Sequence, residues 1–141
     1  KMPRSIWVGY DADFLCKQIE KDYATFKDSL RPNPSSEKVG KRRLAGIYDW
    51  TSGFFPGSLW YAYHMTGDNS VKDEASKFTN LLYPVSKYKG THDIGFMINC
   101  SYGNAERFAP NDTMLPVLKE TADNLIGRFV PQIGAISSWD F

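Results

Sequence analysis

Residues 53–60 read GFFPGSLW, and residues 95–102 read GFMINCSY, so a Gly-Phe pair returns 42 positions after its first occurrence. The same offset aligns Trp60, which ends the first stretch, with Tyr102, which ends the second. Self-similarity at a fixed period of this length is typical of repeat architectures. We predict a repeating unit made of a loop, a helix, a turn and a second helix, which is an αα-hairpin.

Apolar residues at intervals of three and four predict the helices themselves. The predicted helices span residues 12–30, 54–66, 70–83, 95–108 and about 115–131. Asp11 or Asp13 is expected to cap the first helix, while Gly67 and Pro84 are expected to end the second and the third. Residues 31–46, rich in proline, serine and glycine, are predicted to form a loop-rich connection. The inner face of the last helix is predicted to consist of Leu115, Leu118, Ala122, Leu125 and Phe129.

The composition fits one domain with a packed core, since 42% of the 141 residues are hydrophobic and 15% are aromatic. Seventeen basic and sixteen acidic side chains give a net charge of +1, which offers no electrostatic footprint for nucleic acid or an anionic membrane. Cys16 and Cys100 lie far apart, so the pattern favours two buried thiols over a zinc site or a disulfide framework. The two histidines, 28 positions apart, form no metal-ligand motif either. We expect an all-α fold without a cofactor.

We expect a third repeat to begin near residue 137. One more step of 42 positions from Gly95 reaches Ser137, beside Trp139 and Asp140. Hairpins in such arrays bury their inner faces against neighbouring hairpins. We therefore expect residues 1–141 to be the N-terminal part of a single barrel domain, cut after about two and a half hairpins, with the remainder of the same barrel as its partner.

Aromatic and acidic residues precede the first helix of each repeat: Asp49 and Trp50, His92 and Asp93, Trp139 and Asp140. In a ring of hairpins these loops would meet at one rim, where aromatic faces and a carboxylate suit carbohydrate chemistry. Simpler interpretations remain open. Asp93 could cap the helix that follows it, and Asp49 and Asp140 could also be caps. Trp50 and Trp139 could belong to the core.

The strings that surround these residues resemble glycoside hydrolase family 88, the unsaturated glucuronyl hydrolases. They lie in family order and cover residues 49 to 141: residues 49–57 with Leu59-Trp60, then 66–68, 92–97, 128–129 and 138–140. The first string, DWTSGFFPG, and the third, HDIGFM, are together fairly specific. The resemblance implies part of a six-hairpin (α/α)6 toroid from a bacterial enzyme of the periplasm or the cytoplasm.

The family's reaction, as the resemblance implies it, removes a 4,5-unsaturated glucuronyl residue from the non-reducing end of oligosaccharides left by polysaccharide lyases. An acid protonates carbon C4 of the vinyl ether, water adds at C5, and the hemiketal opens and releases the sugar. On this resemblance Asp93 is one of two catalytic aspartates and His92 contacts the substrate. Trp50, Phe54 and Trp139 are expected to line the subsite for the unsaturated uronate.

The second catalytic aspartate is expected beyond Phe141, so we expect residues 1–141 alone to be inactive. Two other functions are compatible with the sequence. The chain could belong to an unsaturated rhamnogalacturonyl hydrolase, or it could be a non-catalytic α-hairpin repeat that binds sugar or protein.

Overall fold

The computed structural model describes residues 17, 21, 32–38, 41–44 and 46–140. Lys17 and Lys21 are both helical, in agreement with the first predicted helix. The rest of that prediction, including its caps Asp11 or Asp13, lies outside the described residues, as does Cys16.

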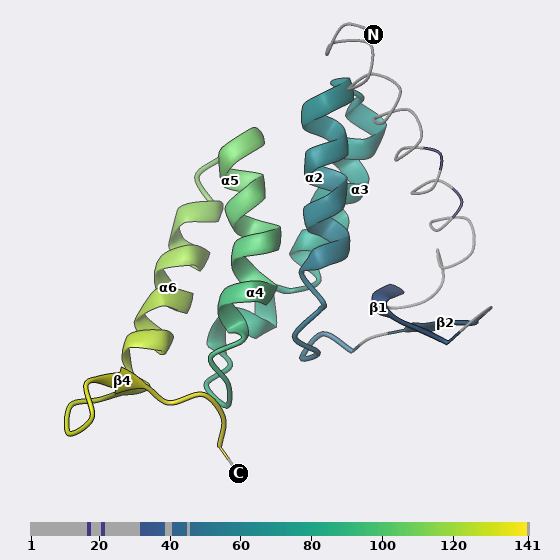
Figure 1. Cartoon of the computed structure of the whole chain (residues 1–141). Coiled ribbons are helices and arrows are strands. Elements are labelled where there is room, and N and C mark those ends of the chain that lie inside the picture. Colours follow the sequence, from purple (N-terminus) through teal and green to yellow (C-terminus); the bar gives the residue numbers. More distant parts are fainter. Residues whose placement is uncertain (1–16, 18–20, 22–31, 39–40, 45, 141) are drawn as a thin grey trace, which may run out of the picture.

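Two helical hairpins lie side by side in the described chain (Figure 1). The elements in chain order are β1 (Pro32–Lys38), β2 (Lys41–Leu44), α2 (Phe54–Thr66), α3 (Asn69–Asn80), the 3₁₀ helix η1 (Tyr83–Lys87), α4 (Ile94–Ile98), the π turn η2 (Asn99–Gly103), α5 (Asn104–Phe108), α6 (Met114–Ile126), β3 (Phe129–Val130) and β4 (Ala135–Ile136). In Figure 1, α2 and the α4–α5 helix start at the same end of the molecule, while α3 and α6 return toward that end. This arrangement confirms the predicted αα-hairpin repeat.

The first hairpin begins and ends close to its predicted bounds. Helix α2 stops at Gly67, whose φ of 69° lies in the left-handed region, and the Gly67 N–H donates to the carbonyl of Tyr63 at 2.7 Å. Asp68 then caps α3 by accepting from the Ser70 N–H at 2.8 Å. Inside the hairpin, the buried Trp60 indole donates from Nε1 to Oγ1 of Thr79 at 2.9 Å, which links α2 to α3.

The second hairpin differs from its prediction in the face that α6 buries. The buried residues of α6 are Met114, Val117 and Thr121, whereas Leu115 is 61% exposed. Because successive helical residues are about 100° apart, the three-four spacing from Met114 turns Leu115 away from α4 and η1. Of the other residues in the predicted face, Ala122 and Phe129 are exposed, and Leu118 and Leu125 are partly buried. The helix also ends at Ile126, before the predicted end near residue 131.

The two inner helices make a close backbone contact. A Cβ on Gly53 would lie 2.3 Å from the carbonyl oxygen of Met97, and a Cβ on Gly57 would lie 2.8 Å from that of Cys100. Both contacts advance in the same direction along the two helices, so α2 packs in parallel against α4 and η2. Lack of space is therefore what requires glycine at position 53. The backbone conformation does not require it, since φ there is −78°, which any residue can adopt.

Two short antiparallel ribbons accompany the helices. The segment over residues 31–46, predicted to be a loop-rich connection, contains the β1–β2 hairpin. Prolines are compatible with it because a two-stranded ribbon has only edge strands, on which a missing N–H is tolerated. The second ribbon, β3–β4, turns at Gly134, where φ is 64°. No helix among the described residues is long and apolar enough to cross a membrane.

Candidate functional site

Asp93 occupies the N-cap position of α4, but its side chain makes no capping hydrogen bond. Its carboxylate is instead shared by two aromatic side chains. Oδ1 lies 3.3 Å from Nε2 of His92, and Oδ2 accepts from Nε1 of Trp139 at 3.1 Å. The side chain of Asp93 is 16% exposed. The simple capping interpretation of this carboxylate is therefore wrong.

His92 is held on one side by a single carbonyl. The oxygen of Ser138 accepts from the backbone N–H of His92 at 2.8 Å and lies 2.9 Å from its ring Nδ1. A carbonyl oxygen can only accept, so this hydrogen bond requires the proton on Nδ1. The other ring nitrogen, Nε2, then faces Asp93, and the imidazole ring lies 5.1 Å from the Trp139 ring.

Trp139 reaches Asp93 because a short extended segment crosses the loop before α4. Trp139 pairs with Thr91 in an isolated antiparallel bridge, and the N–H of Asp140 donates to the carbonyl of Gly90 at 3.4 Å. The Trp139 side chain remains 51% exposed, so it does not belong to the core. The bridge thereby brings Asp93 into direct contact with Trp139, which lies 46 positions later in the sequence.

A second aromatic cluster lies at the start of α2 and α4. Trp50 contacts Phe54 with ring centroids 5.6 Å apart and Phe96 with centroids 6.2 Å apart, both edge-on. Phe54 and Phe96 also contact each other, at 6.4 Å. Trp50 and Phe96 are each 48% exposed. Trp50 is thus a surface residue, and its core interpretation is wrong.

Phe96 was not among the residues that the sequence singled out for binding. The signal was present, because Phe96 is the repeat equivalent of Phe54, 42 positions later. Phe96 also lies three residues after Asp93, so both side chains emerge from the first turn of α4 on the same face. The aromatic cluster of Trp50, Phe54 and Phe96 therefore adjoins the cluster of His92, Asp93 and Trp139. Together they combine exposed rings with one carboxylate, an arrangement that can bind a sugar ring and transfer a proton.

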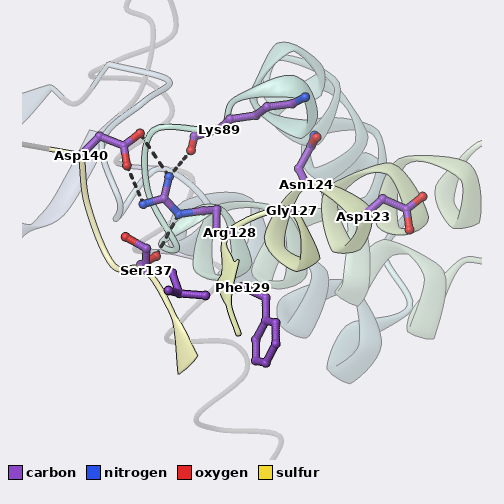
Figure 2. A pocket seen from close by; sticks show the side chains of 9 residues that line it. Lys89, Asp123, Asn124, Gly127, Arg128, Phe129, Ser137 and Asp140 are labelled. Atoms are coloured by element: carbon purple, nitrogen blue, oxygen red, sulfur yellow. Dashed lines mark hydrogen bonds and ion pairs between the residues drawn. The ribbon is translucent and has the colours of Figure 1, made fainter. Parts of the chain in front are cut away.

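Asp49 does not cap α2, whose N-cap is Gly53, contrary to the simplest interpretation. Asp49 accepts from the N–H of Thr51 at 2.9 Å and from its hydroxyl at 2.6 Å, which shapes the turn before α2. Asp140 forms an ion pair with Arg128, with Nη2 and Oδ1 3.0 Å apart (Figure 2).

Two of the cavities lined by described residues lie outside the clusters. One, of about 430 Å³, is shown in Figure 2 and lies beside Arg128. It is lined by Lys89, Asp123, Asn124, Gly127, Arg128, Phe129, Val130, Ser137 and Asp140. The other, of about 830 Å³, lies between η1 and α6 and includes Tyr83, Tyr102 and Val117 in its wall. Asp93 lines neither of them.

Burial changes the titration of two groups on the inner helix. It raises the pKa of Tyr102 to about 12, with a smaller contribution from the neighbouring Tyr83, and it raises the pKa of the free thiol of Cys100. Cys100 is half-buried, whereas the sequence had favoured a buried thiol. Within the part of the chain that the structure describes, no group of three His, Cys, Asp or Glu side chains could hold a metal ion.

The comparisons with known proteins agree on one family. A curated relative from Formosa agariphila, an unsaturated glucuronyl hydrolase, is 42% identical over 94 residues, which are 66% of this chain and 24% of that protein. An unsaturated chondroitin disaccharide hydrolase from Streptococcus pyogenes is 26% identical over 130 residues, or 90% of this chain and 32% of that protein. No family model matches the chain.

A solved structure extends the similarity to nearly the whole chain. It is an unsaturated glucuronyl hydrolase specific for heparin, which is 41% identical and superposes with a TM-score of 0.87. The match covers 96% of this chain and 36% of that one. The chain thus spans about a quarter to a third of the length of these relatives. Sequence and structure together show that the chain belongs to the unsaturated glucuronyl hydrolase family.

Proposed function

We propose that the protein containing this chain removes 4,5-unsaturated glucuronyl residues from the non-reducing ends of lyase-generated oligosaccharides. The relatives named above act on unsaturated glucuronyl or chondroitin substrates, and one is specific for heparin. The observation that supports the proposal best is the orientation of Asp93, whose carboxylate faces His92 and Trp139 instead of capping α4.

In the proposed reaction the C4=C5 bond of the uronate, a vinyl ether, takes a proton at C4. The positive charge then develops at C5 and the ring oxygen, and water adds to C5 and gives up a proton to a carboxylate. The resulting hemiketal opens to a ketone at C5 and a hemiacetal at C1, and collapse of the hemiacetal releases the next sugar. Asp93 is proposed to be one of the carboxylates of this hydration, because proton transfer needs a positioned acid or base. Trp139 fixes the orientation of that carboxylate by donating its indole N–H to Oδ2, and Nε2 of His92 lies 3.3 Å from Oδ1. The other groups of the reaction belong, in this proposal, to the remainder of the barrel.

Substrate binding is assigned to the aromatic rings. We propose that Trp50, Phe54 and Phe96 contact a sugar at the start of α2 and α4, and that Trp139 and His92 contact the unsaturated ring beside Asp93. The exposure of Trp50 and Phe96 supports this role, because large exposed apolar rings that are grouped together are typical of binding sites.

The decisive experiment measures turnover of unsaturated chondroitin and heparin disaccharides as the loss of absorbance of the conjugated uronate. The full-length gene product is compared with Asp93→Asn, which keeps the shape of the side chain and an acceptor for Trp139. We expect kcat to fall by about 10²- to 10⁴-fold, the usual contribution of an acid or base. Asp73→Asn, on the exposed side of α3, serves as the matched control. Near-normal turnover by Asp93→Asn would remove Asp93 from catalysis.

A further inference from the structure

We infer that Arg128 is a positioning residue for the Asp93 site, acting through Trp139. This inference rests on the proposed function, which gives the Asp93 carboxylate its chemical role. Arg128 lies two residues after the end of α6. Its side-chain hydrogen bonds go neither to Asp93 nor to the aromatic cluster. Its side chain is only 6% exposed, and its guanidinium joins the two segments that bring Trp139 to Asp93 (Figure 2).

Backbone hydrogen bonds bring the segment after β4 to the loop before α4. Ser137 donates its N–H to the carbonyl of Arg128 at 2.9 Å, which continues the β3–β4 ribbon by one more pair. Beyond Ser137 the chain leaves the ribbon and crosses the loop before α4. There it makes one isolated bridge, between Thr91 and Trp139. Two backbone hydrogen bonds flank that bridge, so the backbone alone holds Trp139 weakly.

The guanidinium of Arg128 adds side-chain hydrogen bonds to the few that the backbone makes around Trp139. Nε donates to the carbonyl of Ser137 at 2.9 Å, and Nη1 donates to the carbonyl of Lys89. Nη2 and Nη1 donate to the two carboxylate oxygens of Asp140 at 3.0 and 3.3 Å. Lys89 precedes the bridge on one segment, while Ser137 and Asp140 enclose Trp139 on the other. Arg128 therefore ties both segments together on either side of Trp139.

The shape of the arginine side chain matters as much as its charge. A guanidinium is a planar fork whose N–H groups reach several acceptors in fixed directions, whereas a lysine ammonium is a compact charge on a flexible stem. Hydrogen bonds from a charged donor are also about twice as strong as neutral ones. Arg128→Lys therefore keeps the charge and loses the geometry, which makes it the informative variant.

The expected consequence is a displacement of the Trp139 indole from Asp93. Misplacement of a catalytic group by about 1 Å can cost about 100-fold in rate. We expect Arg128→Lys to lower kcat roughly 10- to 100-fold. KM should rise by a smaller factor, because the contact of Trp139 with the sugar is disturbed while Trp50 and the phenylalanines keep theirs. In a Trp139→Phe background, where the indole N–H is already absent, the same substitution should cost less than about threefold, since residues that act as a unit are not additive.

The experiment combines kinetics with a direct view of the indole. The full-length gene product, labelled with ¹⁵N at tryptophan, is prepared as wild type, Arg128→Lys, Trp139→Phe and the double variant. Arg107→Lys, on the exposed face of α5, is the matched control. Trp139→Phe identifies the Trp139 indole N–H signal, which we expect Arg128→Lys to shift and Arg107→Lys to leave in place.

An unshifted Trp139 signal, or equal losses of kcat in both backgrounds, overturns the inference, because Arg128 would then act only on general stability. If the wild-type protein turns over no unsaturated uronide, the proposed function fails. The indole signal still tests Arg128 in that case: a shift supports the positioning role and an unmoved signal refutes it.

Discussion

Gly53→Ala tests the close contact between α2 and α4 that places both aromatic clusters. The new Cβ would lie 2.3 Å from the Met97 oxygen and 2.7 Å from the Phe96 oxygen, both of them backbone atoms. Real Cβ contacts below 3.0 Å essentially never occur, so the helices must separate by at least 0.7 Å, the difference between 3.0 and 2.3 Å. Overpacking of this kind typically costs 1–3 kcal/mol, and because neither obstacle can rotate away we expect about 2–3 kcal/mol.

The repeat offers a matched control for this substitution. Gly95 is the equivalent of Gly53, but a Cβ there would meet only the side chain of Leu125, at 3.9 Å, which is an ordinary contact. Gly95→Ala should therefore be neutral or stabilise the chain by up to about 1 kcal/mol, since alanine is the better helix former. A third variant, Gly57→Ala, meets Cys100 at 2.8 Å and should fall between the other two.

Chemical denaturation followed by circular dichroism measures the three free energies of unfolding. The expected order of stability is Gly95→Ala, then Gly57→Ala, then Gly53→Ala. A Gly53→Ala chain that unfolds within about 0.5 kcal/mol of Gly95→Ala would refute the tight parallel packing, because surface-type substitutions fall in that range.

Two further predictions concern Trp50 and Tyr102. Trp50→Ala in the full-length gene product should raise KM about 10-fold or more and change kcat less, because a stacking residue contributes mainly to binding; an unchanged KM would contradict a contact with sugar. The pKa of Tyr102 is raised to about 12, so the folded chain holds its phenolic proton more tightly than the unfolded chain does. Stability from this group is complete below pH 10 and should decline as the pH rises from about 10 to about 12. Tyr102→Phe should remove that part of the decline in urea midpoints, and identical profiles would disprove the burial effect.

The hairpin repeat could be predicted because its signals are local. The spacing of Leu59 and Trp60 and the glycine at position 67 depend on residues within one helix or its end, and the structure confirms them. The inner face of α6 was predicted one position away from Met114 and Val117, since leucines at exposed positions carried the apolar pattern. Which of several apolar stripes faces the core depends on the neighbouring helix, and no local pattern contains that information.

In the candidate site, too, some features could be predicted from the sequence and others depend on the surrounding structure. The repeat brought His92, Asp93 and Trp139 to one end of the hairpins, and their direct contact agrees with the predicted meeting point. Their roles in catalysis and binding remain predictions. The contribution of Arg128 could not be predicted, because its partners include the carbonyls of Lys89 and Ser137, and backbone acceptors leave no trace in the amino-acid sequence.

The bridge between Thr91 and Trp139 also bears on the order in which the chain folds. It closes a loop of 48 residues that contains the entire second hairpin, and closing such a loop costs about 3 kcal/mol of chain entropy. We expect that cost to be met only after α4, α5 and α6 have packed, which would complete the surroundings of Asp93 late. A nascent chain on the ribosome would acquire its helices well before it acquired a correctly oriented carboxylate.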